Sequence, residues 1–209
     1  MLDIPPLLRA TPDRGPVHLP DEYDPDDNFA HARDAGAWGE DADDASSAEG
    51  ESDAGIEALA WQLLLLANPG DEDAALQQFR VFQEAWVEAG ADESDVADLL
   101  HDASDWRSGF EIAETDAAGM VQALDELAAR WSLRIDWGVE DPTDEAFLAA
   151  AEVPGLLDTA FDRLREYGYT VWVRETDGGY AGWITLSRDD EGMRMLSAAL
   201  GLDLRPAGA

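Results

Sequence analysis

Apolar residues begin to recur at helical spacing at Ile56, and this change of pattern limits which part of the chain can fold compactly. The first predicted helix carries its apolar face on residues three or four apart: Ile56, Leu59, Leu63 and Leu64. This helix ends at the Asn68-Pro69-Gly70 turn, because proline and glycine terminate helices. We therefore expect one folded domain over residues 55–209 and a separate segment over residues 1–54.

The segment over residues 1–54 is predicted to be a disordered acidic tail. It contains 15 acidic residues and three arginines, is rich in Asp, Pro, Ala and Gly, and shows no apolar period. Such a composition buries too little apolar surface to offset the loss of chain entropy.

Helical and alternating patterns follow one another through residues 55–209, which predicts an α+β fold. Further helices are expected from the 71–73 acidic cluster to Gly90, over about 92–103, around Met120–Trp131, over 142–151 and 154–167, and around Met193–Leu200. Strands are expected at Phe110–Ala113, Leu133–Trp137, Tyr169–Arg174 and Tyr180–Leu186. The first two strands, with the helix between them, have the length of a parallel crossover, and the last two form a hairpin through Asp177-Gly178-Gly179. The expected fold is a short, mixed or mostly antiparallel sheet of about four strands packed with about seven helices.

The charge is extreme and narrows the possible partners. The sequence has 47 acidic residues, 13 arginines and no lysine, for a net charge of −34. We expect no direct binding to nucleic acid or to anionic membrane, because a protein that binds either needs an excess of positively charged side chains. A cationic protein is the favoured partner. The alternative is that the charge only keeps the protein soluble.

The sequence contains few features that indicate a cellular location or redox chemistry. The sequence has no cysteine, which removes disulfides and thiolate chemistry. The start MLDIPPLLRATP has no basic region before its apolar residues, and no stretch approaches the ~18 apolar residues of a membrane span. A cytoplasmic location is expected.

The stretch RIDWGVEDPTDEAF, over Arg134–Phe147, concentrates five carboxylates. Asp141 is expected to cap a helix that begins at Pro142, with the next two acids at the positive end of the helix dipole. This leaves Asp136 and Glu140 as a candidate pair for binding a cation or a basic side chain.

Two further residues outside this stretch are candidate binding residues. Trp172 alternates with the apolar side chains of its strand, so either both faces of the sheet are covered or Trp172 is exposed for binding. Arg107 lies in the Trp106-Arg107-Ser108-Gly109 turn, where an ion pair with a nearby acid is the favoured role.

Catalytic and metal-binding motifs are incomplete. His101 is the only histidine in the domain, and a calcium-like series at Asp24, Asp26 and Asn28 lacks the glycine and the glutamate that such a loop requires. No catalytic residue is assigned, and no cofactor or metal ion is expected.

Several segments in order resemble one bacterial family, catalogued as domain of unknown function 6630. The segments are ANPGDEDAALQQFR, DWRSGFEI, LRIDWGVEDPTDE, LREYGYT and YAGWIT. The resemblance covers about residues 56–206 and implies the domain boundary, a bacterial source and a soluble protein. It implies no activity, catalytic residue or cofactor.

The function that these features favour is a non-catalytic module that binds a cationic protein, as inhibitors, immunity proteins, antitoxins and nucleic-acid mimics do. The first alternative is a scaffold whose charge serves solubility. The second is a metal-dependent hydrolase that uses carboxylates such as Asp136 and Glu140.

Overall fold

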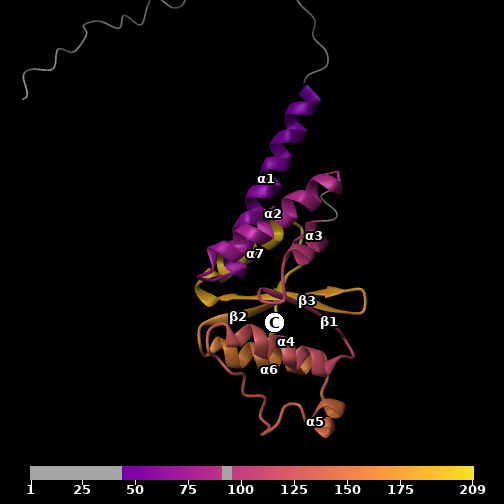
Figure 1. The fold of residues 1–209 in the computed structure, drawn as a ribbon, viewed down its shortest axis with the longest axis vertical. Coiled ribbons are helices and arrows are strands. Elements are labelled where there is room, and N and C mark those ends of the chain that lie inside the picture. Colours follow the sequence, from indigo (N-terminus) through magenta and orange to yellow (C-terminus); the bar gives the residue numbers. More distant parts are fainter. Residues whose placement is uncertain (1–43, 91–95) are drawn as a thin grey trace, which may run out of the picture. The chain divides into compact units, whose positions relative to one another are not determined.

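The computed structural model describes residues 44–90 and 96–209, which form seven α-helices and four β-strands (Figure 1). The helices are α1 (Asp44–Ala67), α2 (Glu72–Glu88), α3 (Val96–Ala103), α4 (Ala117–Ala129), α5 (Glu145–Ala150), α6 (Val153–Arg165) and α7 (Asp190–Ala199), the last preceded by a 3₁₀ turn, η2 (Ser187–Asp189). The strands are β1 (Gly109–Ala113), β2 (Tyr169–Thr176), β3 (Gly179–Leu186) and β4 (Arg205–Pro206). The predicted α+β class is confirmed.

Helices α2 and α4 each begin at an aspartate that caps them. The side chain of Asp71 accepts a hydrogen bond from the backbone N–H of Ala74 at the start of α2. Asp116 does the same for the N–H of Gly119 at the start of α4. Each carboxylate satisfies a backbone donor that has no partner within its helix and lies at the positive end of the helix dipole.

The four strands form one antiparallel sheet in the order β1-β3-β2-β4. The hairpin of β2 and β3 turns at Asp177 and Gly178, and Gly178 has a φ of 95°, which favours glycine. Gly179 belongs to β3, where a Cβ atom would collide with the carbonyl oxygen of Ile112 on β1. The absence of a side chain at Gly179 therefore allows β1 to approach β3 closely.

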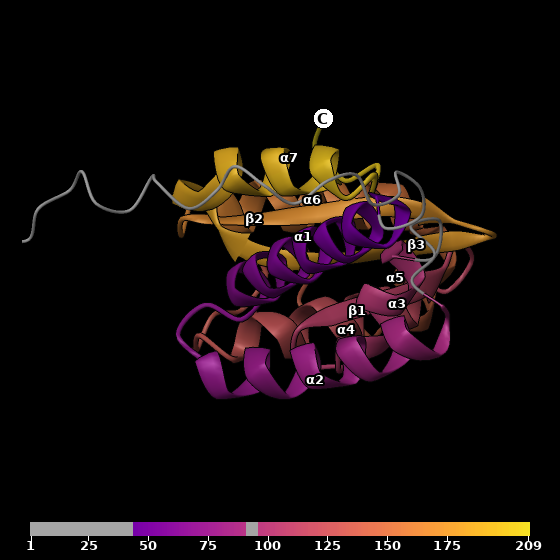
Figure 2. The same ribbon diagram turned by 90° about the horizontal axis from the view of Figure 1, so that it is seen from above.

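Helices cover both faces of the sheet (Figure 1). On one face, α1, α2, α3 and α7 pack over Trp172 and Trp183, which lie opposite each other on β2 and β3. Seen from above, α1 lies between α2 and α7 (Figure 2). On the other face, α4 and α6 pack over Val171, Val173 and Ile184. The sheet is thus the middle of three layers.

The suggestion that Trp172 is exposed for binding is wrong. Its side chain is fully buried, and its indole N–H donates to Thr185 Oγ1 at 3.1 Å. The alternation along β2 arises because both faces of the sheet are covered, so each side chain enters one of two apolar layers.

The predicted strand over Leu133–Trp137 is also wrong, and no parallel crossover forms. This segment has extended backbone but pairs with no strand among the described residues. Ile135 and Trp137 are buried against the layer of α4 and α6, whereas Arg134 and Asp136 are exposed. An extended segment with one buried face shows the same alternation of apolar and polar residues as a strand. The fourth strand is β4, which pairs with Trp172 and Val173.

The domain boundary differs in detail from the expected one. Helix α1 begins at Asp44 and so extends into the interval predicted as tail. The rest of that tail, residues 1–43, lies outside the described residues, as do residues 91–95 in the predicted third helix. Over the part of the chain that the structure describes, no helix is long and apolar enough to cross a membrane.

Candidate functional site

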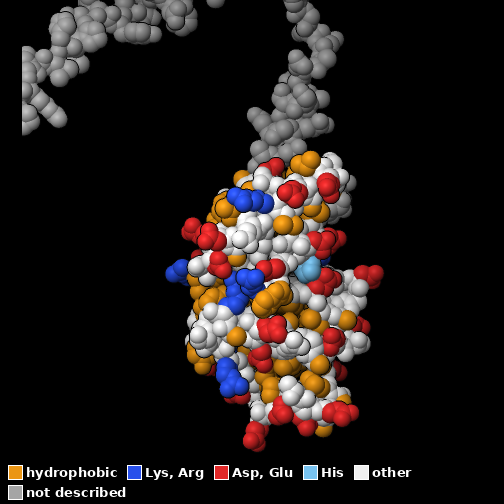
Figure 3. All heavy atoms as spheres, viewed as in Figure 1, with side chains coloured by type: hydrophobic (Ala, Val, Ile, Leu, Met, Phe, Trp, Pro, Cys, Tyr) orange, Lys and Arg blue, Asp and Glu red, His pale blue; other side chains and the backbone are white. Residues whose placement is uncertain are grey.

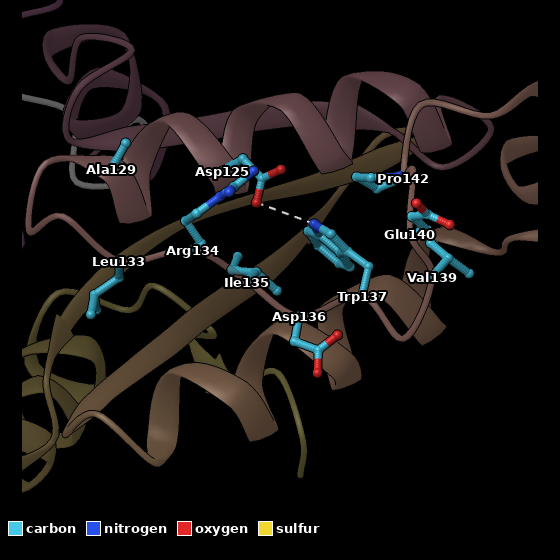
Figure 4. Close-up of a pocket in the computed structure, with 10 residues that line it drawn as sticks. All are labelled: Asp125, Ala129, Leu133, Arg134, Ile135, Asp136, Trp137, Val139, Glu140 and Pro142. Atoms are coloured by element: carbon cyan, nitrogen blue, oxygen red, sulfur yellow. Dashed lines mark hydrogen bonds between the residues drawn. The ribbon is translucent and has the colours of Figure 1, made fainter.

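The carboxylate-rich stretch from Arg134 borders a groove of about 420 Å³ beside α4 (Figure 4). Two residues of α4 line one side, and the segment that connects α4 to α5 lines the other. The lining residues are Asp125, Ala129, Leu133, Arg134, Ile135, Asp136, Trp137, Val139, Glu140 and Pro142.

Asp125 and Trp137 form the polar contact within this groove. The indole Nε1 of the buried Trp137 donates to Asp125 Oδ1 at 3.1 Å. Burial raises the pKa of Asp125, and the Trp137 hydrogen bond, the charge of Arg134 and a backbone hydrogen bond from Ile135 oppose this increase without cancelling it. The Asp125 carboxyl group therefore takes up a proton more readily than an ordinary aspartate does.

Asp136 and Glu140 line the same groove but do not converge on one point. In Figure 4 the carboxylate of Asp136 points away from Asp125, and Glu140 lies farther along the segment. Asp136 Oδ1 accepts the backbone N–H of Gly138 at 3.0 Å, which closes a turn. Both side chains are exposed, so each remains accessible to a cationic side chain of a partner.

The two aspartates that follow have roles different from those predicted. Asp141 accepts hydrogen bonds from the N–H and hydroxyl of Thr143, at 2.9 and 2.6 Å, and these bonds lower the pKa of Asp141. Asp144 caps α5 by accepting the N–H groups of Ala146 and Phe147. The predicted cap at Asp141 is wrong, because the Thr143 hydroxyl engages Asp141 in a turn and the helix begins only at Glu145.

Arg107 lies in the turn between α3 and β1. Its Nε atom is 3.7 Å from Asp105 Oδ2, so the expected ion pair with an acid is present. The guanidinium carbon lies 5.4 Å from the ring centroid of Trp106, within cation–π range. The Trp106 side chain is 65% exposed.

A second groove, of about 560 Å³, collects acids from α3, β1 and the hairpin of β2 and β3. Its lining residues are Asp98, His101, Asp102, Glu111, Arg174, Glu175, Thr176 and Asp177. Arg174 pairs with Asp98 at 2.7 Å, and His101 Nδ1 lies 3.2 Å from Glu111 Oε2. Among the described residues, no group of three histidine or carboxylate side chains has the arrangement of a metal site.

A comparison with models of known protein families identifies the family of this chain. The model of a domain of unknown function, DUF6630, matches residues 59–207. The chain belongs to the DUF6630 family. The match begins within α1, at residue 59, and includes all of β4, so both helical layers and the whole sheet belong to the DUF6630 domain. Searches of curated proteins and of solved structures gave no match.

The DUF6630 domain also contains a buried polar network that sequence reasoning missed. Asn68 Nδ2 donates to Gln78 Oε1 at 2.8 Å, Gln78 Nε2 donates to Ser108 Oγ at 2.7 Å, and Ser108 Oγ donates to Asn68 Oδ1 at 2.5 Å. On α2, Leu76 is 39% exposed whereas Gln78 is buried. The network joins the α1–α2 turn to the turn before β1. A polar residue on the buried side of a helix was the only signal for it in the sequence.

Proposed function

We propose that this DUF6630 protein is a non-catalytic binding module whose partner is a cationic protein in the bacterial cytoplasm. Residues 55–209 contain 32 acidic residues and 10 arginines, for a net charge of −22 without the tail. A field of this sign attracts a cationic surface from a distance and speeds its association.

The observation that carries the proposal is the internal use of the arginines. Seven of the 10 arginines form an ion pair with an acid within the described part of the chain: Arg107, Arg163, Arg165, Arg174, Arg188, Arg194 and Arg205. Their charges are thus largely compensated locally. The remaining carboxylates have few cations beside them, and red groups outnumber blue ones on the face shown in Figure 3.

Part of this negative charge lies in the two acidic grooves. One contains Asp136 and Glu140 on the connecting segment, and the other contains Glu111 on β1 together with Glu175 on β2. They lie at different parts of the surface. A cationic partner therefore has two concave acidic sites available.

The experiment is a capture followed by kinetics. The full chain, immobilised in host lysate at low salt, should retain a basic protein that high salt releases. With the purified partner, the association rate constant should fall at least about tenfold between roughly 50 and 500 mM salt, as the screening length shortens from about 14 to 4 Å. An association rate that stays constant over this range would mean that the charge serves solubility.

A further inference from the structure

We propose that the free edge of β1 receives an extended, basic segment of the partner, which adds to the sheet as a further strand. This inference rests on the proposed function and specifies its binding mode. In the order β1-β3-β2-β4, β1 is an end strand, and no other described strand pairs with its outer edge. An open strand edge is a template for another chain.

The register of β1 shows which backbone groups face outward. The N–H of Glu114 donates to the carbonyl of Gly178 at 2.9 Å, and hydrogen-bonded residues alternate along an antiparallel pair. Ile112 therefore bonds inward to β3, whereas Glu111 and Ala113 direct their backbone groups outward.

Local turns already use some of the outward groups. The carbonyl of Ala113 accepts the N–H of Asp116, and the N–H of Gly109 donates to the carbonyl of Asp105. The N–H and carbonyl of Glu111 and the N–H of Ala113 remain directed at the outer edge. Three consecutive groups at strand spacing are what an added strand would bond.

A groove of about 310 Å³ runs along this edge between α3 and α4. It is lined by His101, Ser104, Asp105, Trp106, Gly109, Phe110, Glu111, Ile112, Ala123 and Glu126. The lining contains three carboxylates and neither lysine nor arginine. Arg107, beside the groove, is already paired with Asp105. The edge is thus complementary to lysine and arginine side chains.

Trp106 supplies an apolar contact at the same place. Its ring is 65% exposed although it lines the groove. Tryptophan is one of the residue types enriched among those that dominate binding energy at protein interfaces. An extended segment that bonds to β1 in this groove would lie beside Trp106 and Glu111.

The charge selects a basic partner over the other possible occupants. A second copy of the chain would bring Glu111 and Glu126 toward carboxylates of the same kind. The chain's own residues 1–54 contain 15 acids and three arginines, so they would also be repelled. The strand edge therefore favours a cationic segment from another protein.

The test uses a fluorescent peptide of about eight residues, a typical strand length, that alternates arginine and valine. Binding to the full chain is measured by fluorescence anisotropy in 50 mM salt. Two further peptides are methylated on the backbone nitrogen of every second residue, one at the odd positions and the other at the even positions. Each methylation removes a hydrogen-bond donor of the added strand and keeps the side chains and the charge. One methylated set should weaken binding at least about tenfold and the other set less than about threefold, because only one set of amides faces β1.

Protein variants locate the site. Ala113→Pro removes an outward N–H from an edge strand, where proline is tolerated, and should weaken binding at least about threefold. Trp106→Ala and Glu111→Gln should each weaken it by about threefold or more. Glu88→Gln, at the exposed end of α2, makes the same charge change as Glu111→Gln and should alter binding less than about twofold.

The outcomes separate the binding mode from the proposed function. If the peptide binds but the two methylated sets behave alike, strand addition is wrong and charge-driven binding stands. If unmethylated peptide leaves the Glu111 and Ala113 amide resonances unmoved in an NMR titration, the site is wrong. If no arginine-rich peptide binds at low salt, both proposals fail. Unequal effects of the two methylated sets, with shifts at Glu111 and Ala113, support strand addition.

Discussion

The indole N–H of Trp137 donates to Asp125 Oδ1 at 3.1 Å and so fastens the segment after α4 to α4 itself. The segment has no strand partner among the described residues, so its position depends on the burial of Ile135 and Trp137, on this hydrogen bond and on the bond from Arg163 Nε to the Asp136 carbonyl. Leu133 adds a backbone bond to Ala128. The groove that displays Asp136 exists because these few contacts hold the segment in place.

Asp125→Asn should stabilise the protein at neutral pH. Burial raises the pKa of Asp125 above its ordinary value of 3.8, so over the interval just above that value the folded state binds more protons than the unfolded state. The native protein therefore loses stability as the pH rises through this interval. The asparagine variant keeps an acceptor for Trp137 and does not ionise.

The difference in unfolding free energy between Asp125→Asn and the native chain should thus rise from pH 3 to pH 7. The gain should stay below about 1 kcal/mol, because Asp125 is only partly buried and solvent screens its charge. Urea unfolding at several pH values measures this difference. Asp125→Ala serves as the control, since it leaves the Trp137 N–H without a partner and should cost about 1–3 kcal/mol. A difference that falls as the pH rises would contradict the assignment.

Asp144→Ala should loosen α5, and Asp141→Ala should not. Asp144 accepts the N–H groups of Ala146 and Phe147, and loss of a cap costs about 0.5–2 kcal/mol. Because α5 has no buried residues, the loss should appear as local fraying. Amide hydrogen exchange at Ala146 and Phe147 should accelerate by about 2- to 30-fold. Equal acceleration in Asp141→Ala would show that Asp141 acts as the cap after all.

Neutralising Asp136 and Glu140 together should affect partner association without affecting stability. Asp136→Asn keeps the acceptor for Gly138, and both side chains are exposed, so the unfolding free energy should change by less than about 0.5 kcal/mol. The association rate with the captured partner should fall, and its salt dependence should flatten.

The matched control for this pair is Asp73→Asn with Glu88→Gln, which removes the same charge from α2 in the opposite helical layer. An equal decrease in the association rate for both double variants would show that net charge acts without a defined site at Asp136 and Glu140.

Most of the fold could be predicted because its helices bury one face and its hairpin has a glycine turn. The error at Leu133–Trp137 came from a pattern that is ambiguous, since any extended segment with one buried face alternates like a strand. Whether the backbone pairs depends on distant partners. The short β4 at Arg205 and Pro206 has too few residues to show any period.

The candidate site was less predictable. Asp136 and Glu140 are neighbours in sequence, so local pattern found both, but their divergent directions depend on the turn at Gly138. Asp98 and Arg174 are 76 positions apart, and no local signal connects them. The choice of Asp144 over Asp141 as the cap was decided by one hydroxyl group, which an aspartate-rich stretch does not reveal.

The last prediction compares two tryptophans that the sequence did not distinguish. Trp172 is fully buried between β2 and the helices above it, and its N–H bonds to Thr185. Trp172→Ala should therefore cost about 3–5 kcal/mol, since it opens a cavity in the core.

The same substitution at Trp106 removes a side chain that is 65% exposed, so Trp106→Ala should change the unfolding free energy by less than about 1 kcal/mol, including its contact with Arg107. Thermal and urea unfolding measure both changes, and anisotropy with the arginine-rich peptide measures binding. Trp106→Ala should lose affinity while it stays folded. If Trp106→Ala instead unfolds the protein to a similar degree as Trp172→Ala, its ring supports the α3–β1 turn, and the exposed surface beside β1 has no separate role in binding.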